Sequence, residues 1–139
     1  MAYEGQLRNV WIFSQLEPSD IARIAKVVVP RTYSKGETIV EEGGQAVAFY
    51  VILSGKVEIR KGGTTLNTLG AGEPVGEMAL LDGYPRSTSV VAVEETECLA
   101  MTRWDFNAEL RTNPSIALAM LPILSKRIRK LEGEEIPGS

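Results

Sequence analysis

Short β-rich segments separated by glycine turns fill the middle of this 139-residue chain and constrain its fold more than any other feature. We expect strands over residues 27–33, 38–41, 48–53, 56–60, 64–69, 87–93 and 97–102. Turn residues such as Gly43-Gly44 and Ser54-Gly55 stand between them. Regular short strands with glycine turns are typical of antiparallel barrels and sandwiches. The pattern therefore predicts an eight-stranded antiparallel, jelly-roll-like barrel.

Helical patterns flank this β region on both sides. Near the N-terminus, Leu7, Val10 and Trp11 share one helical face, and residues 18–20 supply a helix start. We expect Trp11 to be a packing residue and not a ligand contact. After the last strand, one helix is expected from residue 102 to about 111, and another from Asn113-Pro114 to about 132 with a kink at Pro122.

The segments combine into an α+β, mainly β chain with one domain over residues 1–132. Its parts are an N-terminal helical part (1–28), the barrel (29–102) and C-terminal helices (103–132). Residues 133–139 are expected to form a disordered tail. A length of 139 residues fits one domain with a substantial core.

The last helix carries an apolar stripe spaced by four, three, four and three residues, as in a short coiled-coil seam. Its members are Ala117, Leu121, Leu124, Ile128 and Leu131. Two alternatives follow: the stripe packs against the barrel, or it pairs two copies of the chain as a homodimer. The four basic residues within 126–130 are expected to form a solvated helix end and are no evidence of DNA binding.

Composition excludes several kinds of chemistry. The chain has no histidine, which removes histidine-based zinc sites and Ser-His-Asp triads. Its single cysteine, Cys98, lies in an apolar run and is expected to be a buried structural thiol. The net charge of −3 gives no sign of a nucleic-acid surface. No apolar run is long enough for a transmembrane helix and no signal-peptide pattern is present, so we expect a cytoplasmic protein.

Residues 75–92 combine three features that suit a sugar phosphate. A short apolar turn, 78–81, leaves its first backbone N–H groups unpaired. Arg86 adds a permanently charged fork that fits two phosphate oxygens. Glu77 can accept hydrogen bonds from a sugar hydroxyl. The alternative is a solvated turn between two strands, since glutamate at a helix start is favoured by the dipole alone.

The order of these residues resembles a known motif. Gly76-Glu77-x-Ala79-Leu80, a gap of five residues and then Arg86-Ser87-x-x-Val90 is similar to the phosphate-binding cassette of cyclic-nucleotide-binding domains. The glycine pattern over residues 35–57 is similar to the first glycine motif of that family. The resemblance covers nearly the whole chain and implies the same fold.

The resemblance also implies roles for individual residues. Arg86 would bind the cyclic phosphate, with N–H groups from Ala79 and from Ser87–Thr88 beside it. Glu77, with the Gly76 backbone, would hold the ribose 2′-hydroxyl. The implied ligand-binding set is Gly76, Glu77, Met78, Ala79, Arg86, Ser87 and Thr88, and the implied base-covering set is Arg127, Ile128 and Leu131.

Two departures from the family pattern bear on ligand choice. Thr88 replaces a common alanine, where it either crowds the phosphate or supplies a hydroxyl. Leu131 stands where a polar residue reads the base in the catabolite-activator branch, so it can cover a purine but cannot hydrogen-bond it. Neither residue settles the choice between cAMP and cGMP, and we expect cAMP.

Three hypotheses of function remain. The first is a sensor that binds a cyclic nucleotide, needs no metal or further cofactor, and moves its C-terminal helix on binding. The second is an interaction module of the same fold in which Arg86 is locked against Glu77. The third is an enzyme using Glu77 or Asp82, which the absence of histidine disfavours. We expect no nucleic-acid contact and no membrane segment, and a stand-alone sensor and a fragment of a regulator, channel or kinase both fit the sequence.

Overall fold

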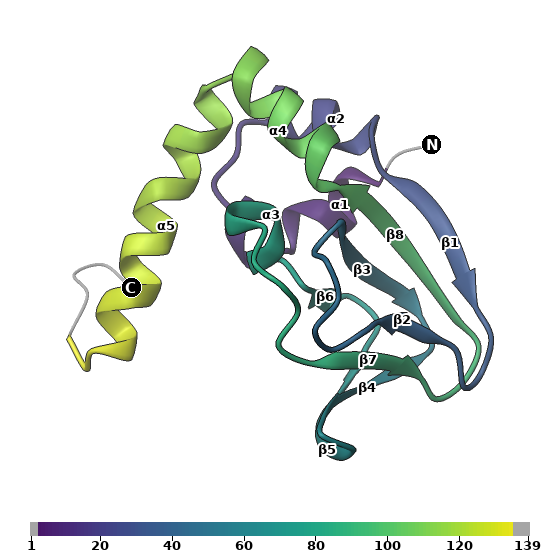
Figure 1. Cartoon of the computed structure of the whole chain (residues 1–139). Helices are drawn as coiled ribbons and strands as arrows, with labels where there is room; N and C mark the ends of the chain where they lie inside the picture. Colours follow the sequence, from purple (N-terminus) through teal and green to yellow (C-terminus); the bar gives the residue numbers. More distant parts are fainter. Residues whose placement is uncertain (1–2, 135–139) are drawn as a thin grey trace.

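Two four-stranded antiparallel sheets form the body of the protein, with helices gathered at one end (Figure 1). The computed structural model describes residues 3–134, except the side chain of Ala79. The first sheet has the order β1 (Val29–Tyr33), β8 (Thr96–Thr102), β3 (Ala48–Ser54) and β6 (Pro74–Val75). The second has the order β2 (Thr38–Val40), β7 (Ser89–Ala92), β4 (Lys56–Lys61) and β5 (Thr64–Gly70).

The predicted jelly-roll-like fold of eight antiparallel strands is confirmed, and its two sheets do not close into one barrel. The outermost strands, β1 and β6 in one sheet and β2 and β5 in the other, each pair with a single neighbour. The edges therefore stay open, and the fold is a two-sheet jelly-roll arrangement. Strand β6 was not predicted, because its two residues are too short to show an alternating pattern. Its Val75 pairs with Tyr50 of β3, and this pairing fixes the position of the next residue, Gly76.

The core consists of two clusters. One lies under the helices and contains Phe13, Phe49 and Phe106, with the first two rings edge to face at 5.7 Å between centroids. The other lies between the sheets and contains Cys98, which is 1% exposed. Burial raises the pKa of the Cys98 thiol to about 11. The prediction of a buried structural cysteine is confirmed.

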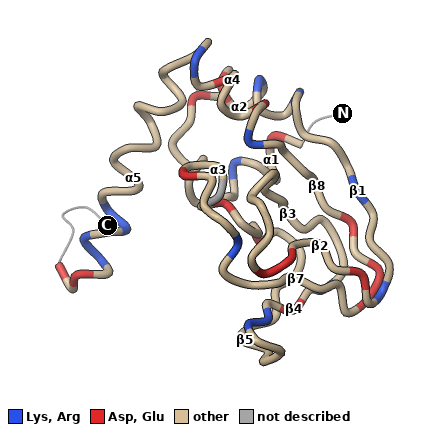
Figure 2. The backbone as a smooth tube through the Cα atoms, in the orientation of Figure 1, with Lys and Arg blue, Asp and Glu red and all other residues tan. Residues whose placement is uncertain are grey.

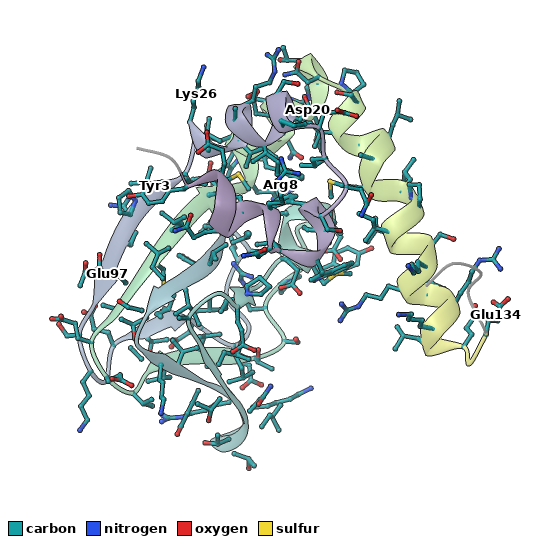
Figure 3. All side chains as sticks on the ribbon, turned by 180° about the vertical axis from the view of Figure 1, so that it is seen from behind. Tyr3, Arg8, Asp20, Lys26, Glu97 and Glu134 are labelled. Atoms are coloured by element: carbon teal, nitrogen blue, oxygen red, sulfur yellow. The ribbon has the colours of Figure 1, made fainter. Side chains whose placement is uncertain are left out.

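The N-terminal helical part consists of three short elements. They are α1 (Glu4–Arg8), the 3-10 turn η1 (Trp11–Phe13) and α2 (Pro18–Ala25). Helix α2 begins at the predicted proline. Its Asp20 is buried and accepts a hydrogen bond of 2.7 Å from the Ser115 hydroxyl, which ties α2 to the start of the last helix. Figure 3 shows Asp20 at that end of the last helix and Glu134 at the other.

Two helices follow β8, namely α4 (Arg103–Thr112) and α5 (Ser115–Leu131). The Thr102 hydroxyl caps α4 by accepting from the backbone N–H of Asp105 at 3.1 Å. The sequence Asn113-Pro114 predicts Asn113 as the N-cap of α5, but Pro114 occupies that position and no side chain caps the helix. Pro122 lies inside α5, where it cannot donate the backbone hydrogen bond of an ordinary helical residue.

Helix α5 rests on the core only through its first turns. Ile116 and Met120 are buried, whereas Leu121, Ile128 and Leu131 are 58%, 57% and 81% exposed. The apolar stripe therefore does not pack against the sheets. Figure 1 shows α5 running away along the outside of the molecule, and Figure 2 shows its charged residues confined to its C-terminal half.

The residues after α5 are described only in part. Gly133 and Glu134 follow the helix, and Arg129 forms an ion pair with Glu134 at 3.1 Å. The rest of the predicted disordered tail, residues 135–139, lies outside the described residues. Within residues 3–134, no helix has the length and apolar character needed to cross a membrane.

Candidate functional site

The cassette expected from the sequence forms a connected structural unit. Val75 ends β6, Gly76 turns the chain, and helix α3 (Met78–Asp82) follows. Gly76 has a φ of +74°, a conformation that glycine adopts far more readily than other residues. A Cβ atom at Gly76 would also overlap the guanidinium of Arg86. This glycine is therefore required both for the turn and for the close approach of Arg86.

The backbone of Arg86 is held by the other glycine motif. Its N–H donates to the carbonyl of Gly44 at 2.9 Å, and its carbonyl accepts from the N–H of Gly43 at 2.8 Å. Gly43 itself has a φ of +81°. These two hydrogen bonds join segments that are about 40 residues apart in the sequence. The Gly43-Gly44 turn thereby fixes the backbone position from which the Arg86 side chain extends. Both glycines act through the backbone.

The guanidinium of Arg86 donates hydrogen bonds to two backbone carbonyl oxygens. Its Nη1 donates to Gly76 O at 3.4 Å and its Nη2 donates to Ala48 O. Among the described residues, no carboxylate lies within ion-pair distance of it. Burial lowers the pKa of Arg86, and the nearby Tyr50 acts in the opposite direction. The pocket therefore contains a partly buried cation that forms no ion pair with a described acidic side chain, which leaves it available to an anionic ligand.

Glu77 has a different partner from the one considered in the sequence analysis. Its Oε1 accepts a hydrogen bond of 3.0 Å from the indole N–H of Trp11. Arg86 and Glu77 are thus not locked in an ion pair, contrary to the arrangement expected for an interaction module. Trp11 packs partly against the core, as predicted, but its polar contact was not anticipated. The two residues are 66 positions apart, so no local pattern could have shown it.

A cavity of about 540 Å³ joins these groups. Six of the seven predicted ligand-binding residues line it, namely Gly76, Glu77, Met78, Arg86, Ser87 and Thr88. The seventh, Ala79, lies in α3, and its side chain is outside the description. The rest of the lining is largely apolar and was missed: Val40, Ile59, Leu69, Pro74, Val75, Tyr84, Pro85 and Val90, with Asp82. A polar end beside an apolar wall, in a volume typical of ligand pockets, suits a nucleotide.

The three residues expected to cover the base lie elsewhere in this structure. Arg127, Ile128 and Leu131 do not line the 540 Å³ cavity. The Arg127 guanidinium carbon lies 4.2 Å from the centroid of the Trp11 ring, and Ile128 and Leu131 are mostly exposed. Their role over a base therefore stays a prediction about the ligand-bound protein.

Comparison with known sequences decides the family. The family model of the cyclic nucleotide-binding domain matches residues 30–113. The chain belongs to this family. The matched segment contains the strands, both glycine motifs and the cassette, so the family resemblance seen in the sequence is confirmed.

Curated relatives extend the likeness beyond that segment. The cyclic AMP receptor protein of Thermus thermophilus is 38% identical over 128 residues, which cover 88% of this chain and 59% of that protein. A CRP-like cAMP-activated global transcriptional regulator of Mycobacterium tuberculosis is 30% identical over 129 residues, or 89% of this chain and 58% of that protein. The chain spans about three fifths of the length of these two relatives.

Solved structures agree on the fold. The N-terminal domain of a transcriptional regulator from Streptomyces coelicolor has a TM-score of 0.86 at 28% identity, with 96% of this chain and 99% of that chain covered. The regulatory domain of Toxoplasma gondii PKA, solved with cAMP, has a TM-score of 0.72 at 26% identity, with 76% and 42% covered. The two curated relatives are named as a cyclic AMP receptor protein and as a cAMP-activated transcriptional regulator, and neither name is that of an enzyme.

Proposed function

We propose that this domain is a cAMP sensor whose ligand is held by Arg86. The observation that carries the proposal is a partly buried guanidinium at the wall of a 540 Å³ cavity, with carbonyl contacts but no acidic partner among the described residues. The singly charged cyclic phosphate would balance this charge and accept hydrogen bonds from the planar fork. The ligand would thereby remove the cost of an uncompensated buried charge.

The remaining cavity residues suit the rest of the nucleotide. Glu77 offers carboxylate oxygens for the ribose 2′-hydroxyl, and Ser87 and Thr88 add hydroxyl groups beside Arg86. The apolar wall from β4, β5 and β7 fits a purine face. We favour cAMP over cGMP because the bacterial relatives are named as a cyclic AMP receptor and as a cAMP-activated regulator. No metal or further cofactor is needed for this binding.

We further propose that α5 moves when the ligand binds. Its C-terminal half carries Arg127, Ile128 and Leu131 outside the cavity, and two of these side chains are largely exposed. A ligand whose purine contacts Ile128 and Leu131 would favour a state in which the end of α5 covers the cavity while Arg127 keeps its contact with Trp11, because the ligand binds that state more tightly. The free energy for the shift comes from this difference in affinity.

The exposed stripe of α5 supports a homodimer through this helix. Leu121, Ile128 and Leu131 present apolar surface that nothing in the described chain covers. We expect Leu121→Glu to shift a concentration-dependent dimer to monomer in sedimentation velocity. Lys126→Glu is the control, since five residues place it about 140° away around the helix. A monomeric wild type at high concentration, or equal dissociation in both variants, would contradict the proposed interface.

Titration calorimetry of the domain with cAMP, cGMP and 5′-AMP tests the sensor. We expect binding of cAMP with nanomolar to micromolar affinity, weaker binding of cGMP, and loss of cAMP binding in Arg86→Ala. Because 5′-AMP has an open phosphate monoester, it tests whether the cavity selects the cyclic form. No heat with any nucleotide, in folded protein free of bound ligand, would contradict the sensor and favour a ligand-independent interaction module.

A further inference from the structure

Trp11 connects the cavity to α5, and no comparison assigns it a role. Its neighbours in η1, Ile12 and Phe13, are fully buried in the core and anchor this turn. Trp11 itself is only partly buried and lies between α3 and α5. Its indole N–H donates to Glu77 Oε1 at 3.0 Å, and its ring face receives the guanidinium of Arg127 at 4.2 Å. One side chain thus contacts both a cavity carboxylate and α5.

The contact with Arg127 lies in the half of α5 that the core does not hold. The helix is buried through Ile116 and Met120 near its start, whereas Arg127 stands seven residues after Met120. Within residues 3–134, Arg127 has no ion-pair partner. A guanidinium above an indole face is a favourable cation–π arrangement. The Trp11 ring is therefore a fixed support for the C-terminal half of α5.

We propose that Trp11 is a positioning residue that orients Glu77 for the ribose and couples this contact to α5 through Arg127. This inference rests on the proposed cAMP site. The indole N–H holds one carboxylate oxygen of Glu77 and leaves the second oxygen for the 2′-hydroxyl. The carboxylate also polarises the indole, which strengthens the attraction of its ring face for Arg127.

Reciprocal coupling follows from this arrangement. A ribose that binds Glu77 in the orientation set by Trp11 stabilises the Trp11 position, and thereby the contact with Arg127. Conversely, a substitution that removes the Arg127 guanidinium from the Trp11 ring weakens the hydrogen bond between Trp11 and Glu77. It thereby lowers the affinity for the ribose. The two effects are equal because coupling between binding events is mutual.

The test compares cAMP with 2′-deoxy-cAMP, which lacks the hydroxyl that Glu77 would accept. We expect Trp11→Phe to reduce the preference for cAMP over the deoxy ligand by about fivefold, within the usual range of coupling between sites. Arg127→Gln should also reduce the preference for cAMP over the deoxy ligand, but by a smaller factor. The double variant should equal Trp11→Phe alone, since both residues act through one contact. Lys126→Gln is the matched control, because Lys126 lines the same groove as Trp11 and Arg127 without stacking on the ring.

Tryptophan fluorescence reports on the contact between Trp11 and Arg127. The chain has two tryptophans, and Trp104 is 60% exposed on α4, so Trp104→Phe leaves Trp11 as the sole reporter. In this background we expect Arg127→Gln, but not Lys126→Gln, to change Trp11 emission without ligand, and cAMP to change it further.

The outcomes separate the two proposals. If wild type binds neither nucleotide, the proposed cAMP site is wrong. If wild type prefers cAMP but Trp11→Phe keeps the same preference, the positioning role is wrong while the site stands. An Arg127→Gln effect that simply adds to that of Trp11→Phe would contradict the coupling through the ring.

Discussion

Two arginines near the same sheet have opposite surroundings. In the hairpin of β4 and β5, Arg60 donates through Nε and Nη2 to Glu58, the latter at 2.7 Å. In the cassette, Arg86 contacts two carbonyl oxygens and, among the described residues, no acid. The hairpin cation is paired with a neighbouring carboxylate, whereas the cassette cation forms no ion pair among the described residues. The difference shows that the site is distinguished by the missing counter-charge and not by the presence of arginine.

The largest expected effect comes from removing each guanidinium in turn. Arg86→Gln should lower cAMP affinity by roughly 100- to 10,000-fold, since about two hydrogen bonds to a charged group at 1.5–3 kcal/mol each are lost. Arg60→Gln should change affinity less than about twofold. In ligand-free protein, Arg86→Gln should leave the melting temperature unchanged or raised, because an unbalanced buried charge is gone. Calorimetry measures the cAMP affinities, and thermal denaturation measures the melting temperatures. A marked loss of ligand-free stability in Arg86→Gln would contradict the contrast drawn between Arg86 and Arg60.

Glycine substitutions sharpen the comparison at the level of the backbone. Gly76 and Gly62 have positive φ values of +74° and +57°, but only a Cβ at Gly76 would meet Arg86. Each alanine should cost about 1–2 kcal/mol of unfolding free energy from backbone strain. Gly76→Ala should in addition weaken cAMP binding at least about tenfold, because the displaced guanidinium loses part of its contact with the phosphate. Denaturant titration and calorimetry separate the two effects, and equal affinities in the two variants would show that Arg86 tolerates the displacement.

The smallest expected effect is on the titration of Glu58. The hydrogen bond from Arg60 holds the pKa of this exposed carboxyl below its ordinary value of 4.5. A lowered pKa means that the pair stabilises the fold above the ordinary pKa and that this contribution is lost as pH falls through the lowered value. Arg60→Gln should return the pKa toward 4.5, and Arg86→Gln should leave it unchanged. Carboxyl NMR titration measures this, and a shift caused by Arg86→Gln would mean that the two regions are electrostatically coupled.

The helix α5 shows where prediction from sequence reaches its limit. Its spacing of apolar residues and its approximate end were predicted, and the helix extends over Ser115–Leu131. Whether the stripe packs inward was left open, because periodicity gives a face but not its partner. In the structure, Ile116 and Met120 form the buried face, whereas Leu121, Ile128 and Leu131 of the stripe stay exposed. The same helical pattern would have fitted either outcome.

Local sequence patterns predicted every strand except β6, the glycine motif over residues 35–57 and most of the cassette residues that line the cavity. These features lie within short windows, where alternation, turn chemistry and motif spacing act locally. Tertiary structure alone decided that the sheets stay open, that Arg86 lacks an acidic partner and that Trp11 binds Glu77. Such pairings join residues tens of positions apart and depend on which neighbours the packed sheets and helices bring into reach, which no local pattern encodes.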